Sequence, residues 1–142
     1  MAVKTLKYQI QIDELISQGG LPPSLYPPEN QPAFRFIDSH SEAGNHIPAL
    51  IKRPSRRLPM SIAISGYALS CFDTEFHATL RYNNLKKSFK NISKTLGDAL
   101  ARGTLKPTDG LVTLADTSGH FDFYEYSDFD ASATFVLVKQ LS

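Results

Sequence analysis

Several kinds of residue and motif are scarce in this sequence of 142 residues, and each absence excludes a kind of site or a class of protein. Cys71 is the only cysteine, which excludes an internal disulfide and a zinc site built from cysteines. No apolar run approaches the roughly 18 residues of a membrane span, and the first residues lack the apolar core of a signal peptide. Lysine and arginine (15) nearly balance aspartate and glutamate (14). We therefore expect a soluble, cytoplasmic protein with no membrane partner.

The motifs that mark many nucleotide- and metal-dependent enzymes are also missing. The sequence has no Gly-rich phosphate loop, no GxSxG nucleophile turn and no HExxH zinc motif. His40 and His46 lie six residues apart without a third ligand nearby, so no metal is expected. Cys71 precedes a predicted helix, where a thiol can be activated, but a buried structural cysteine is favoured.

What is present is sufficient for one folded domain spanning residues 1–142. Hydrophobic residues make up 42% of the chain, enough for a packed core. The apolar patterns predict two helices, 73–87 with Ser70 as its cap and 89–100 ended by Gly103, and six strands: 4–12, 33–38, 60–70 with a bulge or turn at Gly66, 111–116, 120–126 and a central 133–141. We predict an α+β domain with a mostly antiparallel, twisted sheet of about six strands. Two helices follow its third strand and pack on one side.

Residues 19–32 form a proline-rich segment between the first two predicted strands. LPPSLYPPENQP contains five prolines, and proline cannot donate a backbone hydrogen bond to a sheet. We expect an extended surface connector. A polyproline recognition motif is the alternative.

The nearly neutral total conceals segregated charge. Residues 116–130 contain five acidic residues and no lysine or arginine. The basic loop, residues 52–57, contains Lys52, Arg53, Arg56 and Arg57 and no acidic residue. Because the guanidinium group suits phosphate geometry, the basic loop is a candidate contact for a phosphate group, a protein or a nucleic acid. A solvated surface is the alternative, and it is favoured for the lysines of 86–94.

Aromatic and acidic residues alternate in SGHFDFYEYSDFD, residues 118–130. On a strand, Phe121, Phe123 and Glu125 share one face, and His120 lies on the other. A carboxylate in line with two core phenylalanines is unusual, because burying an unpaired charge is costly. Either the strand frays into solvent at Glu125, or Glu125 lies in a pocket and is held by an arginine. His120 and Glu125 are the candidate catalytic residues.

The order of Arg35 in FRFID, Ser70 at the end of GYALS and Glu125 in FYEY resembles the arginine-serine-glutamate class of ADP-ribosyltransferase-like domains. Here Leu-Ser-Cys stands where that family has Ser-Thr-Ser. The resemblance implies that Arg35 and Ser70, with His77 nearby, grip NAD, and that Glu125 stabilises positive charge on the ribose. It predicts that these four side chains and His120 converge on one cleft.

A second resemblance, from Phe34 to the end of the chain, is to small uncharacterised bacterial proteins. It is carried by short motifs: FRF at 34–36, LSCFDT at 69–74, Asp109-Gly110 and Gly119-His120. It implies a fold rather than an activity. We therefore expect an accessory or binding domain that engages a protein or phosphate-bearing partner through the basic loop and a cleft near Arg35, Ser70 and Glu125. An NAD-using enzyme is the alternative, and the sheet edges would permit a homodimer.

Overall fold

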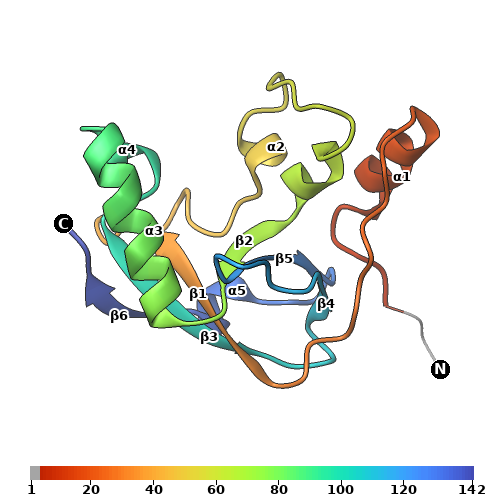
Figure 1. Cartoon of the computed structure of the whole chain (residues 1–142). Coiled ribbons are helices and arrows are strands. Elements are labelled where there is room, and N and C mark those ends of the chain that lie inside the picture. The colour runs from red at the N-terminus through yellow and green to blue at the C-terminus, as the bar shows by residue number, and fades with distance from the viewer. Residues whose placement is uncertain (1–3) are drawn as a thin grey trace.

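The computed structural model describes residues 4–142, and its framework is a single antiparallel sheet (Figure 1). Six strands lie in the order β4-β5-β2-β1-β3-β6. Their bounds are β1 Gln31–Ile37, β2 Leu69–Phe72, β3 Ala99–Leu105, β4 Gly110–Val112, β5 His120–Glu125 and β6 Val136–Gln140. The predicted α+β class and the six-stranded antiparallel sheet are confirmed.

The helical elements are short, apart from one. They are α1 Gln9–Ser17, α2 Ala49–Lys52, the 3-10 helix η1 Ala63–Tyr67, α3 Glu75–Ser88, α4 Ile92–Thr95 and α5 Ala131–Thr134. The 14-residue α3 is the predicted helix 73–87. Its N-terminal cap is Thr74, whose hydroxyl accepts a hydrogen bond from the amide of His77, and not Ser70, which lies within β2. Because α1 replaces the first predicted strand, α3 and α4 follow the second strand and not the third.

Strand register assigns the side chains to two faces of the sheet. Phe34 pairs with Phe72, and Cys71 with Phe121, while successive side chains alternate between faces. What we call the closed face carries Ala33, Arg35, Leu69, Cys71, Phe121, Phe123 and Glu125. What we call the open face carries Phe34, Phe36, Ser70, Phe72, His120, Asp122 and Tyr124.

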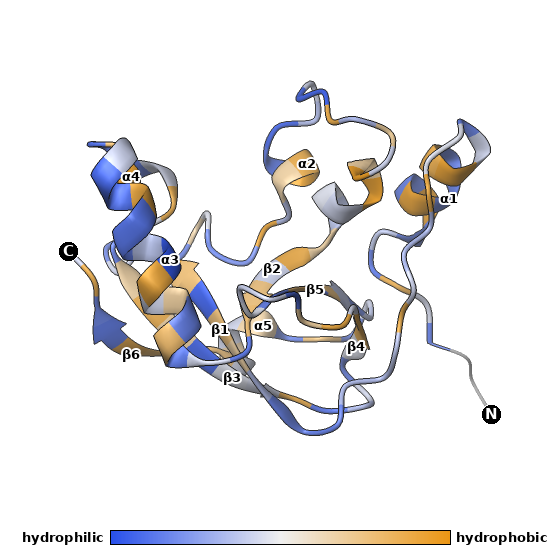
Figure 2. Ribbon diagram, in the orientation of Figure 1, coloured by the Kyte–Doolittle hydropathy of each residue, from blue (hydrophilic) through white to orange (hydrophobic). Residues whose placement is uncertain are grey.

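The two faces are covered differently. On the closed face, Leu69, Cys71, Phe121 and Phe123 form one continuous buried cluster with Phe129 and Phe135 from the segment around α5. On the open face, Phe34 and Phe72 pack against Ala78 of α3 at one end, whereas Tyr124 packs against Ile12 and Ile64 from α1 and η1 at the other. Figure 2 shows hydrophobic residues concentrated along β2 and on α1 and α2. The helices therefore lie on both faces rather than on one, and the open face is left uncovered between its two clusters.

The strand predicted over 4–12 is wrong beyond Leu6. Leu6 makes an isolated antiparallel bridge with Tyr126, and the chain then enters α1. Ile10, an apolar position of the expected alternation, is 82% exposed. Ile12 and Leu15 pack together against η1 and Tyr124, because residues three apart share one side of a helix.

The second predicted helix, 89–100, is also wrong for its second half. Only the single turn α4 forms, and Leu100 lies in β3. Gly97 divides them, with φ +111° and a position where a Cβ would collide with the carbonyl oxygen of Ile37. Only glycine adopts this conformation readily. Gly103 does not cap a helix but lies within β3, where its missing side chain leaves room for Phe135 and Thr134.

Two further segments differ from expectation, whereas the proline-rich segment is extended as expected. Residues 63–67 form η1 rather than strand, with Gly66 packed against Leu50. The last strand β6 is at the edge of the sheet, not central, and all five of its residues are exposed. The proline-rich segment contains no helix or strand before Gln31, but Tyr26 exchanges two 2.8 Å backbone hydrogen bonds with Val112 of the edge strand β4. The segment is thus an extended connector that covers this edge.

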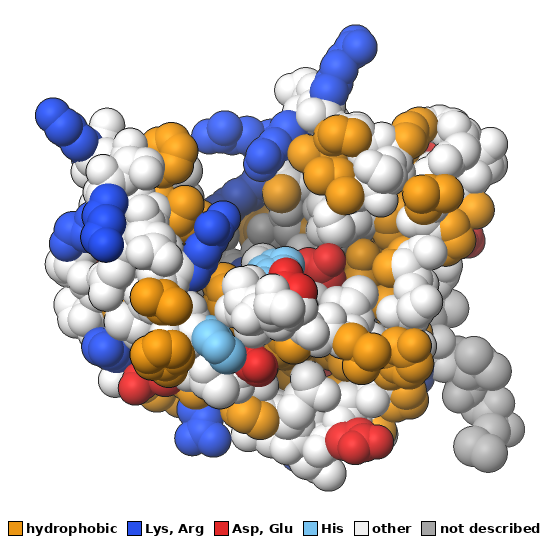
Figure 3. All heavy atoms as spheres, viewed as in Figure 1, with side chains coloured by type: hydrophobic (Ala, Val, Ile, Leu, Met, Phe, Trp, Pro, Cys, Tyr) orange, Lys and Arg blue, Asp and Glu red, His pale blue; other side chains and the backbone are white. Residues whose placement is uncertain are grey.

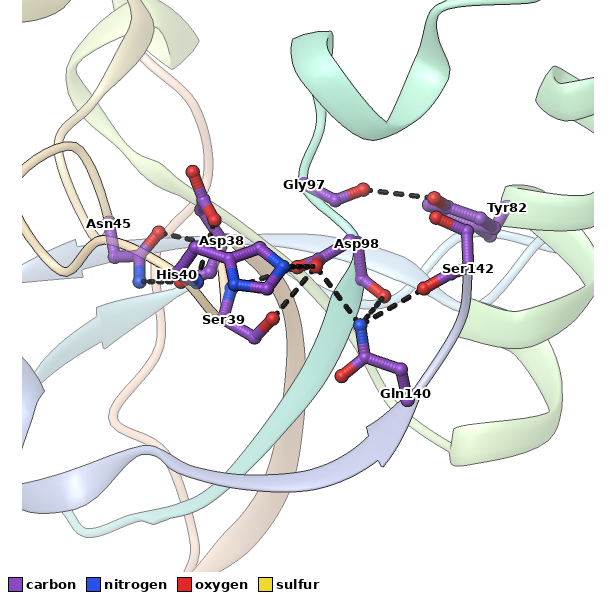
Figure 4. A network of polar contacts seen from close by, with 9 residues as sticks. All are labelled: Asp38, Ser39, His40, Asn45, Tyr82, Gly97, Asp98, Gln140 and Ser142. Carbon is purple, nitrogen blue, oxygen red and sulfur yellow. Dashed lines mark hydrogen bonds and ion pairs between the residues drawn. The ribbon is translucent and has the colours of Figure 1, made fainter.

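A polar network joins the ends of β1, β3 and β6 (Figure 4). The Asp98 carboxylate accepts hydrogen bonds from the Ser39 amide (2.8 Å), the Ser39 hydroxyl (2.7 Å) and Gln140 Nε2 (3.0 Å). These bonds, chiefly those from Ser39, lower the pKa of Asp98 to about 2. Nearby, the buried Tyr82 hydroxyl of α3 donates to the Gly97 carbonyl at 2.9 Å. These contacts hold α3 and the C-terminal strand β6 against the start of β3.

Candidate functional site

A polar strip of three side chains, Ser70, His120 and Asp122, crosses the uncovered middle of the open face. Ser70 and Asp122 are direct cross-strand partners on β2 and β5. Ser70 is exposed, and its Oγ lies 2.6 Å from His120 Nε2. The Asp122 carboxylate lies 3.7 Å from the same nitrogen. The polar strip lies between two apolar clusters, where a sheet is ordinarily covered.

His120 is fixed by the turn that opens β5. The Asp116 carboxylate accepts hydrogen bonds from the amides of Ser118 (2.9 Å) and His120 (3.1 Å). The imidazole meets the ring of Phe72 edge-on, with centroids 5.5 Å apart. Burial raises the pKa of Asp122, and the His120 charge opposes that shift. The imidazole is therefore held in place by β5, by the turn that precedes it and by the ring of Phe72.

A second histidine lies next to this turn. His77, in the first turn of α3, places its Nδ1 2.7 Å from the Asp73 carboxylate. Gly119 has φ +81°, and a Cβ there would collide with both Asp73 and His77. Glycine at this position therefore allows the start of α3 to pack directly against the turn before His120.

The open face is hollowed between α3 and the elements α1, α2 and η1 (Figure 3). Histidine and carboxylate side chains appear on the floor of this hollow, and lysine and arginine side chains along its upper and left margins. The sheet below contributes the polar strip, and the segment after α2 stands above it (Figure 1). Negative and positive charge thus face the same space from different elements.

The basic loop is exposed but its base is rigid. Lys52, Arg53, Arg56 and Arg57 are all exposed, and none makes an ion pair within residues 4–142. Before the loop, Pro48 and Leu50 are buried. Leu50 is tightly packed against Gly66, where a Cβ would collide with its side chain. The four cations are therefore presented from a fixed base without compensating charge.

Arg35 is on the closed face and is only 8% exposed. Its Nη1 donates to the Ser70 carbonyl oxygen at 2.6 Å, and its Nε donates to His46 Nδ1 at 3.0 Å. Its guanidinium also lies over the ring of Phe135. Burial and the Arg35 charge lower the pKa of His46 to about 4, so this imidazole is a neutral acceptor. Arg35 thus contacts the backbone of Ser70 and not its hydroxyl.

Glu125 is buried, with 2% exposure, so the strand does not fray there. Oε1 has no hydrogen-bond partner among the described residues and lies 3.6 Å from Lys7 Nζ. Burial raises the pKa of Glu125, while Lys7 and, more weakly, Arg35 oppose that shift. The nearest cation is therefore a lysine of the N-terminal segment.

The sheet separates the five side chains that sequence reasoning grouped into one cleft. Ser70 and His120 are in contact on the open face, with His77 beside the adjoining turn. Arg35 and Glu125 lie on the closed face. Asp122 and Asp73, the acidic partners of the two histidines, were not identified from the sequence. The alternation within HFDFYEY places Asp122 beside His120, and the i, i+4 spacing of Asp73 and His77 was the available signal for the other pair.

The remaining candidates have structural surroundings. Cys71 is fully buried, and burial raises its pKa to about 11. His40 lies 3.3 Å from Asp98, whereas His46 contacts Arg35, so the two histidines do not share a site. Within residues 4–142 no cluster of three or more His, Cys, Asp or Glu side chains is suited to a metal ion.

Two further findings bear on function. No helix in the described part of the chain is long and apolar enough to cross a membrane. Comparison of this chain with protein-family models, with curated proteins and with solved structures finds no match.

Proposed function

We propose that this domain binds a phosphate-bearing ligand in the hollow of the open face. The observation that most directly supports this proposal is the basic loop. It presents four exposed cations, without ion-pair partners in the described chain, from a buried base beside a hollow with a polar floor. Arginine side chains bind phosphate oxygens through paired N–H donors. The basic loop is the phosphate contact in this proposal.

The floor of the hollow supports a ligand with a second, uncharged part. Asp122 makes it acidic, which repels a phosphate placed directly upon it. Ser70 and His120 offer hydrogen-bonding groups instead. A ligand that carries phosphate at one end and hydroxyl or amine groups at the other, such as a nucleotide, fits this separation of charge.

The test is a thermal-shift titration with ATP, because a ligand of the native state raises the midpoint of unfolding. We expect a shift in the wild type that is strongly reduced in the double variant Arg56→Ala/Arg57→Ala. The matched control is Lys86→Ala/Lys87→Ala, which removes the same charge from an exposed part of α3. Equal loss in both variants would show only non-specific attraction, and no shift in the wild type would refute the proposal for this ligand.

An NAD-using enzyme of the ADP-ribosyltransferase-like kind is the second proposal. The observation in its favour is that Arg35 and Glu125 lie on the same face, near enough for the arginine charge to oppose, weakly, the rise that burial causes in the pKa of Glu125. Both are buried, so NAD would have to open the closed face to reach them. This proposal therefore requires a conformational change that binding in the hollow does not.

The two proposals are distinguished by titration with NAD and by nicotinamide release. The NAD proposal expects a thermal shift that vanishes in Arg35→Ala, and nicotinamide release that falls at least tenfold in Glu125→Gln. Because Arg35→Ala also disturbs the sheet, Glu125→Gln is the decisive variant. An NAD shift that depends on Arg56 and Arg57 but not on Glu125 would instead assign NAD to the hollow.

A further inference from the structure

We propose that Ser70 is a nucleophile activated by His120, and that the open face transfers acyl groups from small esters to water. The activity concerns the same hollow as the proposed phosphate site but does not involve the basic loop. It therefore stands or falls separately from phosphate binding.

The contact between Ser70 and His120 has the geometry of nucleophile and base. The 2.6 Å separation of Ser70 Oγ and His120 Nε2 is that of a short hydrogen bond, within the reach expected for a nucleophile and its base. Ser70 is exposed and the His120 side chain is 34% exposed, so an ester can approach the oxygen. When the serine donates to Nε2, the imidazole is neutral and ready to accept the proton.

The surroundings hold both groups in position. Ser70 lies within β2, and its carbonyl oxygen is fixed from behind by Arg35 Nη1. His120 is fixed by Asp116 through its backbone amide and by the edge contact with Phe72. Reactive side chains mounted on strands are better oriented than those on free loops. The buried Arg35 thus acts as a positioning residue for Ser70.

Asp122 supplies the negative charge that such a step requires. Its carboxylate is 3.7 Å from Nε2 and 21% exposed, so it stabilises the imidazolium formed when His120 takes the serine proton. In the serine protease arrangement the acid contacts the other ring nitrogen. Here base and acid lie two residues apart on one strand, and Asp122 acts on the charge and not on the tautomer.

The chemical step balances without a cofactor. Ser70 Oγ bonds to the acyl carbon while its proton passes to His120 Nε2. The bond to the leaving alcohol breaks, and the alkoxide takes that proton. Water then attacks the acyl-serine, giving a proton to His120, and Ser70 Oγ leaves with it. The net reaction is ester plus water to acid plus alcohol.

The test uses an alkyl fluorophosphonate, which labels activated serines, with mass spectrometry to locate the adduct. We expect one adduct, on Ser70, and none in Ser70→Ala. The matched control is Ser127→Ala, which removes another exposed serine hydroxyl that contacts no histidine. It should label as the wild type does. Hydrolysis of p-nitrophenyl acetate should likewise be lost in Ser70→Ala and be unchanged in Ser127→Ala.

The role of His120 is tested by rescue. His120→Ala should label at least tenfold more slowly, and added imidazole should restore part of the rate, which a merely structural role would not allow. His77→Ala, with unfolding curves recorded for every variant, controls for loss of a neighbouring histidine. Absence of an adduct on Ser70, or labelling that is unchanged in His120→Ala, would overturn the proposal.

Discussion

The two faces of the sheet hold their charged groups in opposite ways. On the closed face, Arg35 and Glu125 are 8% and 2% exposed, and Arg35 is held by the Ser70 carbonyl and His46 whereas Glu125 lies beside Lys7. On the open face, Ser70 is exposed, and His120 and Asp122 are partly exposed, although both share β5 with Glu125. The difference arises from what covers each face: a continuous cluster with Phe129 and Phe135 on one, and two separated clusters on the other.

This contrast shows why residue type alone does not locate a functional site. An arginine on β1 and a glutamate on β5, two strands separated by β2, resemble binding and catalytic groups, yet here they contact protein atoms. Serine and histidine are ordinary surface residues, yet here they touch each other in a hollow bordered by cations. We therefore assign stability to the closed face and propose that chemistry takes place on the open one.

The largest effect on stability is expected from a substitution on the closed face. Arg35→Ala removes the donors to the Ser70 carbonyl and to His46, two part-buried hydrogen bonds. We expect a loss of about 2–4 kcal/mol in the free energy of unfolding, measured by urea denaturation. A loss below about 0.5 kcal/mol would show that Arg35 is free to serve a ligand, contrary to the account.

Asp98 extends the comparison, because it is buried like Glu125 but its carboxylate accepts hydrogen bonds from Ser39 and Gln140. Asp98→Asn should cost about 1–3 kcal/mol at neutral pH. Because the folded-state pKa of about 2 lies below the usual 3.8, this contribution is present above 3.8 and disappears as the pH falls through about 2. Urea denaturation of both proteins from acid to neutral pH measures it, and a constant difference across that range would contradict the assignment.

Glu125 should show the opposite dependence on pH with a smaller effect. Its pKa is raised above the usual 4.5, so folding favours the protonated form, and stability falls as the pH rises through the folded-state value. Glu125→Gln cannot ionise. Relative to this variant, the wild type should therefore lose stability between acid and neutral pH. A wild type that gains on the variant over that range would mean that Lys7 outweighs burial.

Ser70→Ala should have the smallest effect on stability. The hydroxyl is exposed and its carbonyl contact with Arg35 is retained, so we expect a change within about 0.5 kcal/mol, measured by thermal unfolding. Labelling by the fluorophosphonate should nevertheless disappear. A large loss of stability would mean that the Ser70–His120 contact is structural.

The sequence predicts those parts of the fold that depend on local pattern. The alternation of HFDFYEY correctly places Phe121, Phe123 and Glu125 on one face. The four-residue spacing of apolar groups correctly predicts a helix at α3, although α3 buries Ala78 and Tyr82 and leaves Phe76 and Leu80 exposed. The alternation at 4–12 misled because four apolar residues fit a strand or the start of a helix equally well. The second helix failed because Gly97 adopts a left-handed conformation against Ile37, a contact that arises only in the folded sheet.

Two residues of the site were predictable from the sequence, but its arrangement and the role of Asp122 were not. Ser70 and His120 were both candidates, but they are separated by 50 positions, and only the β2–β5 register brings them together. This register is set by which residues of each strand face the core. A shift of one position along a strand reverses the face on which a side chain lies, and for this reason Arg35 and the Ser70 hydroxyl lie on opposite faces.

The most direct test of the account is a ¹H–¹⁵N correlation spectrum of the wild type titrated with ATP. We predict chemical-shift changes at the backbone amides of Arg56, Ser70 and His120, and no change at the side-chain Nε–H of Arg35. Shifts at Arg35 Nε–H and the amide of Glu125, with the basic loop unchanged, would place the ligand on the closed face and contradict the assignment of chemistry to the open one.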